Sequence, residues 1–206
     1  MEIQEIRTLR GPNYWSGYWK KLIVMRLDIG DYEQRPSNKI AGLPDRMRGA
    51  MPGLKLHGCS YGEEGGFFRR VEEGTWAGHI VEHFALELQT LAGMDTGYGR
   101  TRETDESGIY DVVFSYLEEE VGRFAARAAV ELFVALAEDG DIGEIRTKLA
   151  EDVQRMREIR EEVRFGPSTG SLVEEAVNRG IPYIRLNDQS LVQLGYGVHQ
   201  KRIQAT

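Results

Sequence analysis

Two long segments carry apolar residues at helical spacing, and this pattern constrains the fold more than any other feature. In residues 75–93 one stripe of apolar residues consists of Ile80, Phe84, Leu88 and Leu91. They recur at intervals of three and four residues, so they share one face of a helix, which we expect to begin with Thr75 as N-cap and to end at Gly93. Residues 118–140 carry a second stripe and predict a second helix, opened by Glu118 or Glu119.

Four segments predict strands on which these helices can pack. They are residues 2–9, 21–29, 98–104 and 109–116. The first two are expected to pair, and the last two form a hairpin around the turn at residues 105–108. We expect a short helix at residues 43–50 and a further strand at residues 67–71, after a glycine-rich loop at 58–66. The predicted order, strand, helix, hairpin, helix, indicates an α/β (α+β) fold.

The last third of the chain has a different character. Residues 141–165 are heavily charged but keep apolar residues at helical spacing, which predicts an amphipathic connector helix. Beyond it we expect a short helix at 172–178 and strands at 183–186 and 191–194. Two short strands make a marginal sheet. We therefore expect three parts, residues 1–140, 141–165 and 166–206, the last being the beginning of an incomplete domain of a longer protein.

Composition narrows the class of protein. Acidic residues outnumber basic ones by 33 to 26, which gives a formal net charge of -7 and argues against nucleic acid as a partner. Cys59 is the only cysteine, and the first ten residues lack the apolar core of a signal peptide. No apolar run approaches the roughly 20 residues that span a bilayer. These features predict a cytoplasmic protein without a membrane segment.

The most specific motif is H-x-x-E-H at residues 79–83, on the first predicted helix. Residues four apart share one helical face, so His79 and His83 can converge on one zinc ion. Glu82 precedes the second histidine and can act as the general base beside the metal. The alternative is that both histidines are buried helix residues that bond to backbone carbonyls.

A catalytic zinc needs a third protein ligand, which the sequence offers in the acidic run at residues 118–120. We expect Glu120, and then Glu119, to supply it, because Glu120 lies one turn before the buried stripe of the second long helix. The alternative is that these glutamates are solvated and only complement the helix dipole.

Two further groups could bind a substrate. Arg100 and Arg102 alternate along a strand and could hold carboxylates, or they could form salt bridges within the protein. The aromatic residues Tyr14, Trp15, Tyr18 and Trp19 could stack on guanidinium groups or pack in the core. Residues 58–66 are expected to form a turn or a substrate-covering flap. Cys59 is expected to be a partly buried thiol, and His57 is a weak candidate for a functional residue because it belongs to no motif.

The motifs together resemble the N-terminal domain of cyanophycin synthetase. The matching segments are residues 10–15 (RGPNYW), 21–28 (KLIVMRLD), 74–76 (GTW), 78–83 (GHIVEH) and 99–104 (GRTRET). Residues 166–169 (GPST), 179–182 (RGIP), 194–197 (LGYG) and 200–206 (QKRIQAT) are similar to the start of that enzyme's ATP-grasp domain. The resemblance covers nearly the whole chain.

The resemblance implies a parent ligase that makes a polymer with an aspartate backbone and arginine side chains, with ATP and Mg used in ligase domains that this chain lacks. It implies that the N-terminal domain holds the polymer and, in some members, cuts it into primers at a zinc site that His79, Glu82 and His83 match. It also implies a homo-oligomer. The H-x-x-E-H arrangement in addition resembles that of zinc peptidases with the inverted motif, which implies a metallohydrolase-like fold. The alternative function is a polymer-tethering module without catalysis.

Overall fold

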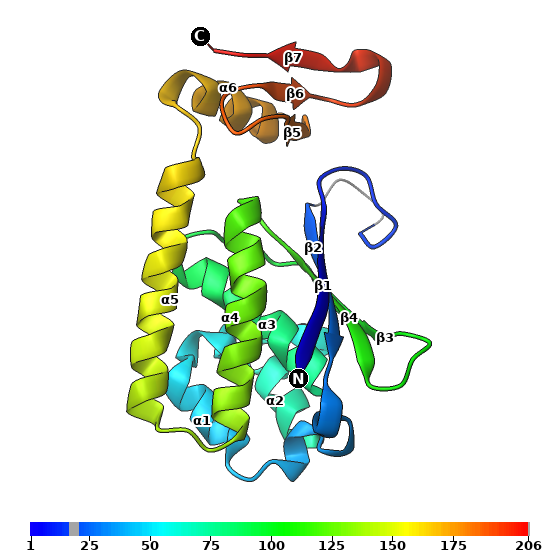
Figure 1. Cartoon of the computed structure of the whole chain (residues 1–206), viewed down its shortest axis with the longest axis vertical. Coiled ribbons are helices and arrows are strands. Elements are labelled where there is room, and N and C mark those ends of the chain that lie inside the picture. Colours follow the sequence, from blue (N-terminus) through cyan, green and yellow to red (C-terminus); the bar gives the residue numbers. More distant parts are fainter. Residues whose placement is uncertain (17–20, 206) are drawn as a thin grey trace.

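A computed structural model describes residues 1–16 and 21–205 of the chain (Figure 1). The helices are α1 (Leu43–Ala50), α2 (Gly66–Glu73), α3 (Ala77–Leu91), α4 (Glu119–Ala137), α5 (Ile142–Val163) and α6 (Pro167–Asn178). The strands are β1 (Glu2–Leu9), β2 (Leu22–Asp28), β3 (Gly99–Glu103), β4 (Ile109–Ser115), β5 (Tyr183–Arg185), β6 (Val192–Leu194) and β7 (Lys201–Ile203). The predicted mixed fold of helices and strands is confirmed.

The first sheet is antiparallel with the strand order β1-β2-β4-β3, so β3 lies at one edge. Both predicted pairings are present, β1 with β2 and β3 with β4. Side chains alternate between the two faces of the sheet. Ile23 and Met25 of β2 and Phe114 of β4 point to the face that carries the main core, whereas Val24 and Val113 belong to a small cluster with Trp15 on the other face.

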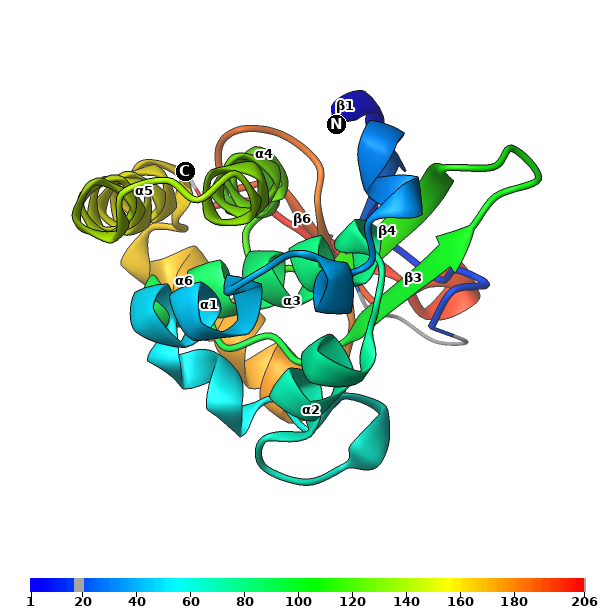
Figure 2. The same cartoon turned by 90° about the horizontal axis from the view of Figure 1, so that it is seen from below.

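Helices α3 and α4 cover the main-core face of the sheet, and α5 packs against α4 (Figures 1 and 2). Seen from below, α3 lies in the middle of the molecule, with α1 and α2 on one side and β3 and β4 on another (Figure 2). Most of the apolar stripes predicted for the two long helices is buried: Phe84 of α3 and Val121 of α4 are both 0% exposed, whereas Leu91 at the end of α3 is 38% exposed. The hydrophobic effect therefore holds both helices on the sheet.

Two local predictions were wrong. Residues 67–71 belong to helix α2 rather than to a strand, because Phe67, Phe68 and Val71 are buried together at helical spacing. Thr75 does not cap α3, since Trp76 takes the N-cap position without a side-chain hydrogen bond. The Thr75 hydroxyl instead lies 3.0 Å from Nδ1 of His79.

The C-terminal unit, residues 166–205, lies beyond the end of α5 (Figure 1). Its sheet has the order β5-β6-β7 and contains one strand more than the sequence predicted. The missed strand, β7, is only three residues long and polar, so it carries no apolar alternation.

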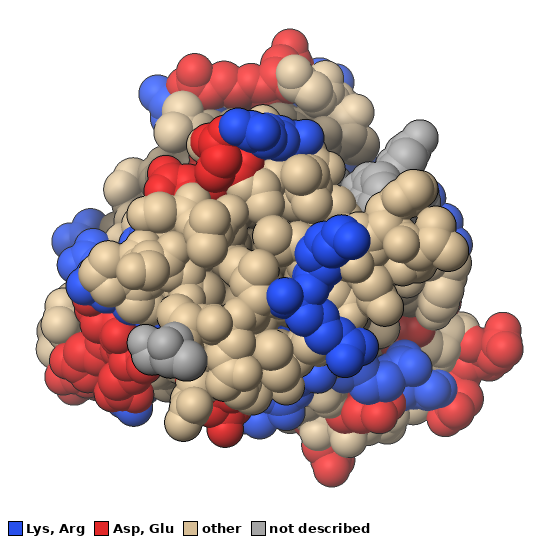
Figure 3. Space-filling model, turned by 90° about the horizontal axis from the view of Figure 1, so that it is seen from above, with Lys and Arg blue, Asp and Glu red and all other residues tan. Residues whose placement is uncertain are grey.

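Seen from above, a short band of Lys and Arg side chains crosses a largely uncharged surface (Figure 3). Within the described residues, no helix has the length and apolar character needed to cross a bilayer.

Gly122 allows the start of α4 to approach the sheet closely. A Cβ atom at this position would lie 2.8 Å from Cβ of Tyr116 and 3.0 Å from Cγ1 of Ile23. We expect Gly122→Ala to lower the free energy of unfolding by about 1 to 2 kcal/mol, because overpacking costs about 1 to 3 kcal/mol and helix propensity returns at most about 1 kcal/mol. Urea unfolding measures the difference.

Gly97→Ala is the matched control, because a Cβ atom there would meet nothing within 4 Å. We expect its free energy of unfolding to stay within about 0.5 kcal/mol of the parent chain. A Gly122→Ala variant that is as stable as Gly97→Ala would contradict the close approach.

Candidate metal centre and its surroundings

His79 and His83 lie one turn apart on α3, as the spacing predicted. Their ring centroids are 4.8 Å apart, with the planes at 87°. Both rings are turned toward α2, where Phe67 stacks on His83 at a centroid distance of 4.0 Å. The apolar stripe of α3 occupies another side of the helix and holds it in the core, so the position of the two rings is fixed by packing.

The third donor beside the two histidines is Cys59. Its Sγ lies 3.3 Å from Nε2 of His79, and the donor atoms of Cys59, His79 and His83 all lie within 4.8 Å of one another. Among the described residues, this is the group of three or more His, Cys, Asp and Glu side chains close enough to hold a metal ion. Cys59 adopts a φ of 49° in the short 3-10 turn Cys59–Tyr61, a conformation uncommon outside glycine.

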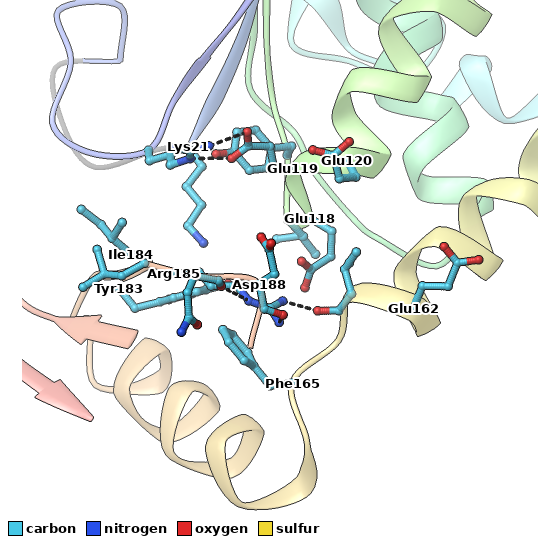
Figure 4. Close-up of a pocket in the computed structure, with 16 residues that line it drawn as sticks. Lys21, Glu118, Glu119, Glu120, Glu162, Phe165, Tyr183, Ile184, Arg185 and Asp188 are labelled. Carbon is cyan, nitrogen blue, oxygen red and sulfur yellow. Dashed lines mark hydrogen bonds and ion pairs between the residues drawn. The ribbon is translucent and has the colours of Figure 1, made fainter. Parts of the chain in front are cut away.

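The acidic run at the start of α4, expected to supply a glutamate as third ligand, is not part of this group of donors. Arg10 donates two hydrogen bonds to Glu119, at 2.6 and 2.8 Å, so both carboxylate oxygens are engaged. Glu119 and Glu120 line a pocket of about 390 Å³ that faces the C-terminal unit (Figure 4). The first turn of α4 points toward β5, a direction that sequence spacing does not reveal.

Glu82 is buried between α3 and β3. The Thr101 hydroxyl donates a hydrogen bond of 2.7 Å to Oε2 of Glu82, and a Cβ atom at Gly99 would come within 2.1 Å of Oε1. Burial raises the pKa of Glu82 to about 7, against the opposing effect of the Thr101 hydrogen bond. A carboxyl group of this kind can exchange a proton near neutral pH.

The two histidines are held in the neutral form. Burial, with a smaller contribution from Arg70, lowers the pKa of His79 to about 4. Burial, together with the neighbouring His79 and His57, lowers the pKa of His83 well below its usual value. Metal ions bind the neutral imidazole, so this environment favours coordination over protonation.

A second layer of polar groups surrounds the histidines. His57 Nδ1 lies 2.8 Å from His83 Nδ1, and His57 Nε2 lies 3.0 Å from Oε2 of Glu87. Sequence reasoning set His57 and Cys59 aside and did not consider Glu87. The signal was present, because Glu87 follows His83 by four residues and shares its helical face, and because His57 and Cys59 flank one glycine in a short loop.

The predicted substrate-binding residues lie on the other face of the sheet. Thr101 faces Glu82, so its neighbours Arg100 and Arg102 point away from it, and the guanidinium carbon of Arg102 lies 5.9 Å from the ring centroid of Trp15. Tyr14 contacts Trp15 at 5.2 Å and is 81% exposed. The structure thus brings Arg102, Trp15 and Tyr14 together but separates them from the metal donors. Tyr18 and Trp19 lie outside the described residues.

Residues 23–138 match the family described as cyanophycin synthase-like N-terminal domain. The chain belongs to this family. Over its full length it is 53% identical to the cyanophycin synthetase of Synechocystis sp. and 52% identical to those of Crocosphaera subtropica and Trichormus variabilis. These matches confirm the family that the motifs indicated. The chain covers 23% of each of these relatives, less than a quarter of their length.

Lys21 lies in the pocket that faces the C-terminal unit (Figure 4), with Nζ 3.3 Å from the ring centroid of Tyr183. Burial lowers its pKa to about 8, although Glu118 and Glu119 oppose the shift. Between pH 8 and 10 the unfolded chain binds the Lys21 proton and the native chain does not. The free energy of unfolding contributed by this residue therefore rises with pH in that range.

We expect the parent chain to gain on the order of 1 kcal/mol relative to Lys21→Met between pH 7.5 and 9.5. Urea unfolding at both pH values measures the gain. Comparing two variants at each pH cancels the titration of the tyrosines, which both chains share. A constant difference between the two chains would show that Lys21 titrates normally.

Proposed function

We propose that this chain is the N-terminal part of a cyanophycin synthetase and that it contains a zinc-dependent hydrolase site acting on the polymer. The observation that carries the proposal is the convergence of Cys59, His79 and His83. Glu82, on the same helix as both histidines, has a buried carboxyl group whose pKa is raised to about 7. Three protein donors with one open position are typical of catalytic zinc, whereas structural zinc has four protein ligands.

The donor set fits zinc in chemistry and in spacing. One sulfur and two neutral imidazole nitrogens are ligands that zinc prefers. Tetrahedral zinc with bonds of about 2.0 to 2.3 Å separates its ligand atoms by about 3.3 to 3.6 Å, and Cys59 Sγ already lies 3.3 Å from His79 Nε2. The three donors need only small side-chain movements to close around an ion, because none is more than 4.8 Å from another.

Zinc bound here would polarise a peptide carbonyl and make water more acidic. The chain's own contribution is proton transfer by Glu82, which accepts the proton of the attacking water and passes it to the leaving nitrogen. Thr101 holds one oxygen of Glu82 through its hydrogen bond of 2.7 Å and thereby orients the carboxyl group. Glu82 is only 5% exposed, so little bulk water competes for its carboxyl group.

The polymer implied by the family resemblance would present both carboxylates and guanidinium groups. We propose that Arg100 and Arg102 bind carboxylates of the polymer and that Trp15 and Tyr14 stack on its guanidinium groups. Since these residues lie on the face of β3 away from Glu82, the polymer would have to pass around the edge strand to reach the metal donors.

That separation also favours the second candidate function, a tethering module that holds polymer near ligase sites without cutting it. In both readings ATP and Mg act in the remainder of a longer ligase, and residues 166–206 begin its ATP-grasp domain. We propose that the full protein forms a homo-oligomer in the cytoplasm. Polymer binding with no zinc and no cleavage would favour the tether.

The identity of the third ligand is tested by zinc content. We expect the purified chain to hold close to one zinc ion, and Cys59→Ala to lower its zinc affinity by at least about tenfold. Glu120→Gln is the matched control and should leave zinc affinity unchanged. Competition with a chromophoric chelator gives both affinities. Loss of zinc in Glu120→Gln but not in Cys59→Ala would overturn this ligand set.

The role of Glu82 is tested by separating zinc binding from cleavage. We expect Glu82→Gln to retain zinc and to lower the rate of polymer shortening by about 10² to 10⁴-fold, the usual contribution of a general base. Electrophoresis of purified cyanophycin after incubation measures the rate. A Glu82→Gln variant that shortens polymer at the parent rate would exclude this mechanism.

A further inference from the structure

A buried hydrogen-bonded series runs from Glu87 through His57 to His83. His57 Nε2 lies 3.0 Å from Oε2 of Glu87, and His57 Nδ1 lies 2.8 Å from Nδ1 of His83. The side chains of His57 and Glu87 are only 16% and 7% exposed. Neither residue holds the metal or moves a proton in the mechanism proposed for this site.

The surrounding backbone holds this series in place. The N–H of His57 donates to the carbonyl of Leu54 at 3.1 Å, and the His57 carbonyl accepts from the N–H of Phe67 at 3.0 Å. A Cβ atom at Gly53 would come within 1.9 Å of Oε1 of Glu87, so the carboxyl group packs against a position where a larger residue does not fit. His57, the partner of His83, and Glu87, the partner of His57, are therefore fixed before any ion arrives.

The donors and acceptors give the series a direction. A carboxylate only accepts hydrogen bonds, so the hydrogen between Glu87 and His57 lies on Nε2 of His57. In a neutral imidazole the other nitrogen is then an acceptor. Nδ1 of His57 therefore accepts from Nδ1–H of His83, which leaves Nε2 of His83 with its lone pair free.

We propose that Glu87 and His57 are positioning residues that fix the ring tautomer of His83, so that Nε2 of His83 is the nitrogen that binds the metal. The inference deepens the proposed function and rests on it for the metal. Its geometric basis is independent, because it concerns hydrogen bonds within the chain.

His79 has the corresponding arrangement with a different partner. Thr75 Oγ1 lies 3.0 Å from Nδ1 of His79, on the opposite side of the ring from Nε2, which faces Cys59 Sγ at 3.3 Å. In both histidines Nδ1 thus lies within hydrogen-bond distance of another side chain of the protein. Outer partners of this kind orient metal ligands, and their loss usually costs about 10 to 100-fold in metal affinity.

The first test reads the tautomer directly in the metal-free chain. Long-range ¹H–¹⁵N correlation spectra of the 206-residue protein distinguish a protonated from an unprotonated ring nitrogen. We expect His83 to carry its hydrogen on Nδ1 and His57 to carry its hydrogen on Nε2. A His83 ring with its hydrogen on Nε2 would overturn the proposal, and this reading requires no variant to fold.

The second test measures zinc affinity in substituted chains by chelator competition. His57→Phe removes the acceptor for Nδ1–H of His83, and we expect it to weaken zinc binding by about 10 to 100-fold. His57→Asn puts an amide oxygen near the position of Nδ1 and should restore most of the affinity. Lys55→Ala, an exposed change in the same turn, is the control and should match the parent chain. Parent-like affinity in His57→Phe would overturn the positioning role.

The two tests separate this inference from the proposed function. If the parent chain binds no zinc, the hydrolase proposal fails, while the tautomer spectrum still decides whether Glu87 and His57 orient His83. If zinc binds and polymer is cut but His83 has the other tautomer, the hydrolase proposal survives and the positioning role is lost.

Discussion

Burial of α3 on nearly all of its sides is the constraint on which the candidate site depends. The sheet, α4 and α2 surround this helix, and even its charged residues Glu82 and Glu87 are only 5% exposed. Desolvation follows from that position and accounts for the raised pKa of Glu82 and the lowered pKa values of both motif histidines. The core that stabilises the fold and the chemistry of the site therefore have a common origin.

The sequence predicted the secondary structure best where the apolar repeat extends over many residues. The bounds of β1 and α1 were predicted to the residue, and α3, α4 and α5 fell within their predicted segments, because burial of one face imposes a strong repeat. Helix α2 was missed although it is as long as α1, because its paired phenylalanines also suit a strand. The prediction of Thr75 as N-cap was wrong for another reason, because its hydroxyl lies beside the imidazole of His79 and does not cap the helix.

Only the part of the candidate site that lies on α3 could be predicted from the sequence. His79, Glu82 and His83 lie on one helix, so their relation follows from helical geometry alone. Cys59 and His57 come from a loop 20 or more residues before His79, and the direction of that loop depends on tertiary packing. The assignment of Glu119 and Glu120 assumed that the start of α4 faces α3. In the folded chain it faces the C-terminal unit, where Arg10 neutralises Glu119.

The edge position of β3 has a consequence for association between molecules. An edge strand offers unpaired N–H and C=O groups to any other extended chain, and uncontrolled pairing leads to aggregation. β3 is five residues long, and three of them, Arg100, Arg102 and Glu103, are charged. Short length and charge are the common safeguards against edge-to-edge growth of sheets. Arg100 and Arg102, which could bind an acidic ligand, thus also hinder the pairing of β3 with an edge strand of another molecule.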